Sequence, residues 1–161
     1  MKLVVISCDK YEPWWKPFFT LLEKYYPHHP DVVLITETKK CPYCETINVN
    51  SNVWTIRFRE GLKQIEDKEV LIMLDDFFIR QPVDEKRINN LKFDDNIACY
   101  NFELEYREPE RNFSPGWDVQ KNYQIYLNSC QPSVWNREIL MDRLYCVKNP
   151  QEWETTVVNV P

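Results

Sequence analysis

Two adjacent carboxylates, Asp75 and Asp76, directly follow the apolar run 70–74, which is typical of a strand buried on both faces. Adjacent like charges raise each other's pKa, and a divalent cation removes that repulsion. Mg²⁺ is typically held by one or two carboxylates plus substrate phosphates, and open α/β sheets bind ligands beyond the carboxyl ends of their strands. The pair therefore indicates a metal–diphosphate site. A solvated turn is the alternative interpretation, since Asp is common in turns.

A second candidate for chemistry is the motif Cys41-Pro42-Tyr43-Cys44, which has the residue types of a glutaredoxin active site. A reactive thiolate there needs the N-terminus of a following helix. Residues 45–50 are rich in β-branched residues and Asn, which are poor helix formers. No second C-x-x-C completes a four-thiolate zinc site. We expect a loop staple or two inert thiols, and a thiol–disulfide oxidoreductase remains an alternative.

Composition limits the classes of function. The chain of 161 residues has a formal net charge of −5, which argues against nucleic acid as a partner. With two Gly residues, it contains no glycine-rich phosphate loop. No apolar stretch reaches transmembrane length, and no signal-peptide core is present, so a cytoplasmic protein is expected. The length predicts one domain over residues 1–161.

The hydrophobic pattern alternates between strands and helices. The first helix is expected to begin at Pro13 and to bury Trp14, Phe18, Leu22 and Tyr25. The order of elements predicts a parallel sheet with helices on both sides. The other expected elements are strands at 3–7, 31–36, 70–75, 97–102 and 123–127, helices at 54–65, 83–91 and 136–147, and loops at 37–52 and 103–122.

Several segments, taken in order, resemble a family of small bacterial and phage-associated GT-A glycosyltransferases, often found in surface-polysaccharide loci. The matching segments are 4–11, 14–19, 36–37, 54–62, 74–78, 127–135 and 149–154. The resemblance implies an α/β fold: a single Rossmann-like GT-A domain with a mostly parallel central sheet flanked by helices. Relatives usually continue beyond the last helix, so we expect that a C-terminal extension is missing after Pro161.

The resemblance also implies a function, the transfer of a sugar from a nucleotide-diphosphate sugar, expected to be UDP-linked, to a carbohydrate or other hydroxyl acceptor. A divalent metal, Mn²⁺ or Mg²⁺, would assist by neutralising the diphosphate leaving group. A sugar- or nucleotide-binding module of the same fold without catalysis is the alternative.

Roles for individual residues follow from the same resemblance. Glu154 is the candidate general base for an inverting reaction, with Glu152 as the competing choice. Arg57 would offer a forked cation to a phosphate, and Asp9 would accept hydrogen bonds from ribose or base. The full set comprises the nucleotide-binding residues Ser7, Asp9, Tyr11, Arg57 and Asp75, the metal ligands Asp75 and Asp76, and the acceptor-binding residues Gln131, Ser133 and Trp135.

Overall fold

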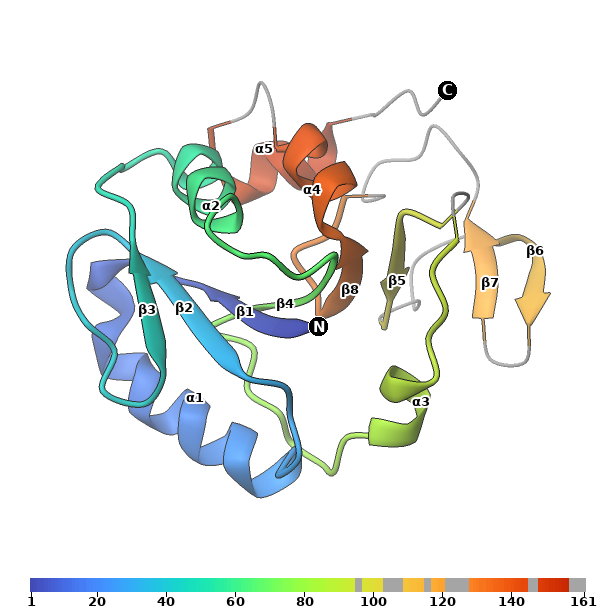
Figure 1. The fold of residues 1–161 in the computed structure, drawn as a ribbon, viewed down its shortest axis with the longest axis horizontal. Helices are drawn as coiled ribbons and strands as arrows, with labels where there is room; N and C mark the ends of the chain where they lie inside the picture. The colour runs from blue at the N-terminus through green and yellow to red at the C-terminus, as the bar shows by residue number, and fades with distance from the viewer. Residues whose placement is uncertain (95–96, 103–108, 115–116, 121–127, 145–147, 157–161) are drawn as a thin grey trace.

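A six-stranded sheet forms the centre of the computed structural model, in the order β3-β2-β1-β4-β8-β5 (Figure 1). The structure describes residues 1–94, 97–102, 109–114, 117–120, 128–144 and 148–156. Strands β1 to β4 run parallel, and β8 is antiparallel to both of its neighbours. This confirms the expected α/β fold with a mostly parallel sheet. The strands are β1 (Lys2–Ile6), β2 (Val32–Thr36), β3 (Glu45–Asn48), β4 (Glu69–Leu74), β5 (Cys99–Asn101) and β8 (Ser133–Asn136).

Helices cover both faces of the sheet (Figure 1). The helix α1 (Glu12–Tyr25) packs on one face, where it meets Leu3 and Val5 of β1. The helices α2 (Trp54–Leu62), α4 (Arg137–Arg143) and α5 (Pro150–Thr155) lie over the other face. There the core contains Val4 and Ile6, because successive side chains of a strand point to opposite faces. In the described part of the chain, no helix is long and apolar enough to cross a membrane.

The buried face of α1 differs from the prediction by one position at its start. Trp14 is 50% exposed, whereas its neighbour Trp15 is 1% exposed. The indole nitrogen of Trp15 donates a hydrogen bond of 2.8 Å to the Ser7 hydroxyl, which explains why this tryptophan is the one turned inward. At the other end Tyr26, rather than Tyr25, enters the core.

Two segments expected to be loops contain strands. The edge strand β3 lies within 37–52, and an antiparallel hairpin of β6 (Pro109–Ser114) and β7 (Trp117–Gln120) lies within 103–122. Short strands escape detection by pattern, and β3 buries only Ile47. The 3₁₀ helix η1 (Asp9–Tyr11) and α3 (Glu85–Asn89) complete the described elements. The strand expected at 123–127 lies outside the described residues.

Candidate functional site at the carboxyl ends of β1, β2 and β4

The carboxyl ends of three neighbouring strands meet at one edge of the sheet. Ile6 pairs with Ile35 of β2 and with Leu74 of β4, so the residues that follow these strands come together. The Ser7 hydroxyl donates a short hydrogen bond to Asp75 and accepts one from Trp15. Ser7 and Asp75, both predicted to contact nucleotide, are therefore joined directly.

The two adjacent carboxylates differ in their exposure. Asp75 is 4% exposed, while Asp76 faces solvent. Burial raises the pKa of Asp75 to about 6; the Ser7 hydrogen bond acts against this rise, and the charge of Asp76 adds to it. A desolvated carboxylate beside an exposed one suits a hard divalent cation, which would stabilise both negative charges. Among the described residues, no group of three or more His, Cys, Asp or Glu side chains is placed to hold a metal. Phosphate and water oxygens are the usual further ligands of such a cation.

Arg57 of α2 reaches the same edge from the face of the sheet opposite α1. Its guanidinium is buried and donates to the backbone carbonyls of Ser7 at 3.0 Å and Ser51 at 2.6 Å. It also forms an ion pair of 2.6 Å with Glu37, which follows β2. Arg57 therefore fixes the backbone at the end of β1 and brings positive charge to the site, although that charge is shared with Glu37.

Asp9 joins the end of β1 to the segment after β2. Its carboxylate accepts hydrogen bonds from the Thr36 hydroxyl and from the backbone N–H groups of Thr38 and Lys39, at 2.9 to 3.0 Å, and from the Thr38 hydroxyl. Burial acts to raise the pKa of Asp9, but these hydrogen bonds outweigh it and hold the pKa well below the usual range. The carboxylate predicted to bind nucleotide thus already organises the loop around it.

Glu154 approaches the acidic pair through the turn that precedes β8. One of its carboxylate oxygens accepts a hydrogen bond of 2.9 Å from the backbone N–H of Cys130. Burial raises the pKa of the Cys130 thiol, and the nearby charges of Glu154 and Asp76 raise it further. Strand β8 is antiparallel to β4, with Ser133 opposite Ile72, so the turn before β8 lies at the carboxyl end of β4. The bond to Cys130 therefore brings the candidate base to the same edge of the sheet as the candidate metal ligands.

Glu152 has a different environment from Glu154. Its carboxylate accepts a hydrogen bond of 2.8 Å from the backbone N–H of Lys148, and its own N–H donates to the side chain of Asn149 at 2.9 Å. The two bonds tie Glu152 to both residues that precede α5, as in a capping box in which the side chain reaches one residue beyond the N-cap Asn149. The arrangement gives Glu152 a structural task, which favours Glu154 as the base.

The predicted acceptor residues are mostly inaccessible. Ser133 and Trp135 are both 0% exposed, and the Trp135 indole donates a hydrogen bond of 2.8 Å to the Ser133 hydroxyl. An acceptor cannot reach either side chain in this conformation, so we leave both out of the proposed site. Gln131 is half-buried in the turn beside Cys130, and Tyr11 is 38% exposed at the end of η1.

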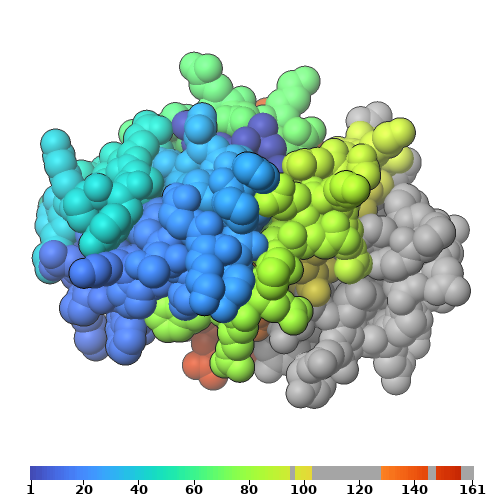
Figure 2. Space-filling model, turned by 90° about the horizontal axis from the view of Figure 1, so that it is seen from below, coloured from blue at the N-terminus to red at the C-terminus, as the bar shows by residue number. Residues whose placement is uncertain are grey.

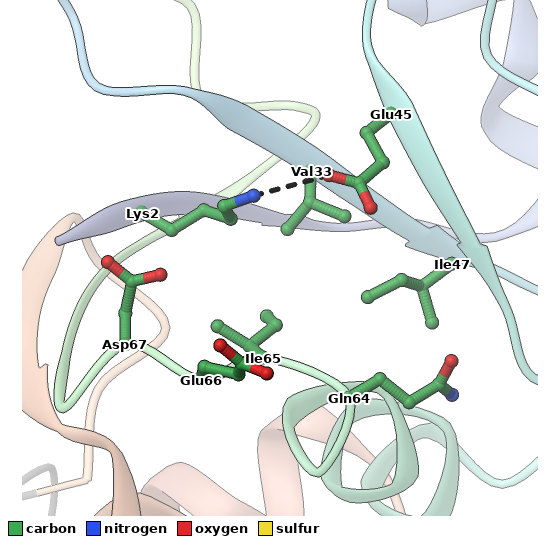
Figure 3. A pocket seen from close by; sticks show the side chains of 8 residues that line it. All are labelled: Lys2, Val33, Glu45, Ile47, Gln64, Ile65, Glu66 and Asp67. Atoms are coloured by element: carbon green, nitrogen blue, oxygen red, sulfur yellow. Dashed lines mark hydrogen bonds and ion pairs between the residues drawn. The ribbon is translucent and has the colours of Figure 1, made fainter.

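A pocket of about 230 Å³ lies at the opposite end of the strands (Figure 3). Its lining includes Lys2, at the start of β1, and Glu45, at the start of β3, which form an ion pair of 3.2 Å across Val33. Glu66 and Asp67, which precede β4, close its other side. Because it lies at the amino ends of the strands, this pocket is separate from the Asp75–Asp76 edge.

Comparison with solved structures identifies the fold. The bifunctional IspDF from Campylobacter jejuni aligns with a TM-score of 0.58 and 16% identity, over 92% of this chain and 44% of that one. The galactosyltransferase LgtC, in complex with donor and acceptor sugar analogs, aligns with a TM-score of 0.56 and 12% identity, over 99% of this chain and 67% of that one. The apo-form glycosyltransferase GlyE from Streptococcus pneumoniae aligns with a TM-score of 0.51 and 12% identity, over 88% of this chain and 36% of that one. The fold is of the GT-A type.

This GT-A-type chain spans less than half the length of IspDF and of GlyE. No protein-family model matches it, and no curated protein matches its sequence. At these identities the comparisons identify the fold alone. The functional assignment therefore depends on the residues at the sheet edge.

Three residues at this edge of the sheet were not among the predicted site residues. Glu37 forms an ion pair with Arg57. The Trp15 indole donates a hydrogen bond to Ser7, and the Cys130 N–H donates one to Glu154. The position of Glu37 after a predicted strand was a usable signal. Nothing in the sequence pattern distinguishes Trp15 from Trp14, or Cys130 from the other cysteines.

Proposed function

We propose that this protein is a metal-assisted glycosyltransferase that binds a nucleotide-diphosphate sugar at the carboxyl ends of β1 and β4. We expect the donor to be a UDP-sugar and the protein to act in the cytoplasm. The observation that carries the proposal is the pairing of Ser7 with the buried Asp75 beside the exposed Asp76. A ligand-free turn would not need a buried carboxylate with a pKa of about 6. The neighbours named as glycosyltransferases share the fold, which supports the same class of reaction.

Asp75 and Asp76 would hold the cation, with Mn²⁺ or Mg²⁺ as the matching ions. When bound, the cation supplies positive charge that stabilises the diphosphate as it leaves. The side chains of η1, Asp9 and Tyr11 among them, would face the base and ribose. Arg57 would position the backbone of Ser7 and add positive charge near the phosphates, as a buried, hydrogen-bonded guanidinium can do without large motion.

Glu154 would accept the proton of the acceptor hydroxyl if the reaction inverts the anomeric centre. Its hydrogen bond to the Cys130 N–H fixes the carboxylate, which has further lone pairs with which to receive a proton. Gln131, next to Cys130, is the remaining acceptor-binding candidate.

A thermal-shift panel tests the proposal. The protein is heated with UDP and the other nucleoside diphosphates, each with Mn²⁺ or with EDTA. We expect UDP to raise the melting temperature more with Mn²⁺ than with EDTA; at about 100 times its Kd the ligand adds about 2.7 kcal/mol of stability. No shift with any nucleotide would contradict a donor site. Metal-dependent UDP binding without release of UDP from any UDP-sugar would favour the alternative, a binding module without catalysis.

A further inference from the structure

A pair of cysteines outside the proposed site occupies the connection between β2 and β3. Cys41 is 7% exposed and belongs to the core beneath α1, and Cys44 packs against the same core. Two residues separate these cysteines in the sequence, both side chains pack on this one core, and the Cys44 thiol donates a hydrogen bond to the carbonyl of Glu45 at 3.3 Å. Between them, Tyr43 stacks on Phe19 of α1 with ring centroids 5.5 Å apart. The sulfur atoms are therefore held together by the fold.

The strand after Cys44 determines what this pair can do. β3 begins at Glu45, so no helix N-terminus faces the thiols, as the sequence predicted. The motif thus lacks the feature that makes a C-x-x-C pair an efficient catalyst for other proteins' disulfides. Its own oxidation needs only two close sulfur atoms and a small oxidant.

The same connection carries the groups that hold Asp9. Thr38 and Lys39 donate their backbone N–H groups to the Asp9 carboxylate, each at 3.0 Å. The Lys39 carbonyl accepts from Asn48 at 2.8 Å, and the Cys41 N–H donates to the Thr46 hydroxyl at 2.9 Å. Only Lys40 separates Lys39 from Cys41. A displacement of Cys41 therefore reaches Asp9 through a short segment that is hydrogen-bonded on both sides of Lys40. In Figure 2, this segment and β3 (teal) lie beside α1 (blue) on the face seen from below.

We propose that Cys41 and Cys44 form a reversible, peroxide-driven disulfide that loosens the attachment of the 36–39 segment to Asp9. In the first step the Cys41 thiolate attacks one oxygen of hydrogen peroxide; an S–O bond forms, the O–O bond breaks and hydroxide leaves. In the second step the Cys44 sulfur attacks the Cys41 sulfur, an S–S bond forms and the sulfenic oxygen leaves as water. Two thiols and one peroxide thus give one disulfide and two waters.

The electrostatics of the described cysteines favour this order of events. The neighbouring Cys44 thiol lowers the pKa of Cys41 to about 7 against the effect of burial, and Cys41 together with burial raises the pKa of Cys44. Burial raises the pKa of Cys8 and of Cys130. Cys41 is accordingly more ionised at neutral pH than those two thiols, and the thiolate is the reactive form.

Disulfide formation changes the loop in two ways. The sulfur atoms, which belong to free thiols in this structure, become bonded at about 2.05 Å. The Cys44 thiol also loses its proton and with it the hydrogen bond to Glu45. The first change pulls on Cys41 and the second frees Cys44 to move with it. Along the chain from Cys41, the attachments met in turn are the bonds to Thr46 and Asn48, and then the N–H groups of Lys39 and Thr38 on Asp9.

The test combines peptide mass spectrometry with amide hydrogen exchange by NMR, on the full chain reduced and then treated with one equivalent of hydrogen peroxide. We expect a Cys41–Cys44 disulfide, and exchange at Thr38 and Lys39 faster by about five- to tenfold, a change that reverses with dithiothreitol. The Cys8→Ser variant should behave like the wild type, while Cys44→Ser should form no disulfide and keep slow exchange after peroxide.

Two results would overturn the proposal: stable oxidation of Cys41 without a disulfide, or a disulfide that leaves exchange at Thr38 and Lys39 unchanged. The wild type alone decides both, so poor folding of Cys44→Ser does not affect the outcome. Neither readout uses nucleotide. A protein that forms the disulfide and loosens the segment but never binds UDP would contradict the proposed function and not this inference.

Discussion

The Ser7 hydroxyl donates a hydrogen bond to the carboxylate of Asp75, and this contact joins the carboxyl ends of β1 and β4. Ser7 at the same time accepts from the Trp15 indole at 2.8 Å, so α1 is tied to the same point. All three side chains are buried. The contact therefore links the placement of a helix to the charge state of a carboxylate that we assign to metal binding.

Ser7→Ala should destabilise the protein by about 1–3 kcal/mol at pH 8, because it leaves a buried indole N–H and a buried carboxylate without their partner. Urea unfolding measures the change. Thr20→Ala is the matched control, since the Thr20 hydroxyl bonds only to a carbonyl of its own exposed helical turn, and it should change stability by less than about 0.5 kcal/mol. Equal effects of the two variants would contradict the linking role of Ser7.

Asp75 should make the apoprotein less stable as the pH rises from about 4 to about 6. Its pKa is near 3.9 in an unfolded chain and about 6 in the fold, so the folded state binds more protons within that window. The free energy of unfolding should fall by up to about 3 kcal/mol over this window and then stay constant at higher pH. Urea unfolding of wild type and Asp75→Asn at several pH values measures it, and the variant should lack this fall.

The effect of Asp9 on the pH dependence of stability is opposite to that of Asp75. Its pKa is lowered in the fold, so its stabilisation is complete above about pH 4 and is lost only at more acidic pH. The two aspartates therefore act in separate windows. A wild-type stability that rises between pH 5 and pH 6 relative to Asp75→Asn would show that Asp75 is not buried as described.

Asp9→Asn should lower stability by about 2 kcal/mol at pH 7, since an amide nitrogen cannot accept the hydrogen bonds that one carboxylate oxygen takes from Thr38. Asp31→Asn, at an exposed position before β2, serves as the control in the same unfolding measurement. If Asp9→Asn retained full stability and lost only nucleotide affinity, the carboxylate would act on the ligand rather than on the loop.

Glu154→Gln should lower kcat by about 10²–10⁴-fold with little change in donor affinity, because a general base acts on the acceptor proton. The amide oxygen can still accept from the Cys130 N–H, so the fold should be kept. Glu152→Gln is the control: its amide oxygen can preserve the cap on Lys148, and activity should change little. Equal losses in the two variants would mean that α5 shapes the site without supplying a base.

The sequence predicted the central strands and helices because their buried residues form unbroken apolar runs or stripes. The apolar run before Asp75 identifies β4 and the edge at which its carboxylates lie, and the stripe Trp54, Phe58, Leu62 identifies α2. The edge strand β3 was missed because it is short and half-exposed. Trp14 was wrongly placed inside because adjacent aromatic residues give α1 two almost equivalent apolar stripes.

The contacts that build the site could not be predicted in the same way. Ser7 and Asp75 are 68 residues apart in sequence, and Cys130 and Glu154 are 24 apart. Such pairs depend on strand order and register, which a local pattern does not contain. The burial of Ser133 and Trp135 likewise follows from the insertion of β8 between β4 and β5.

The most direct test of the account is the calorimetric titration of UDP into wild type and Asp76→Asn, each with Mn²⁺ and with EDTA. Glu66→Gln is the control, since it removes the same charge at the opposite end of the strands. We predict that Mn²⁺ strengthens UDP binding to wild type and Glu66→Gln by at least tenfold and has no effect on Asp76→Asn, whose stability should hold or rise as repulsion is relieved. Equal UDP affinity in all three proteins, with or without Mn²⁺, would contradict the account.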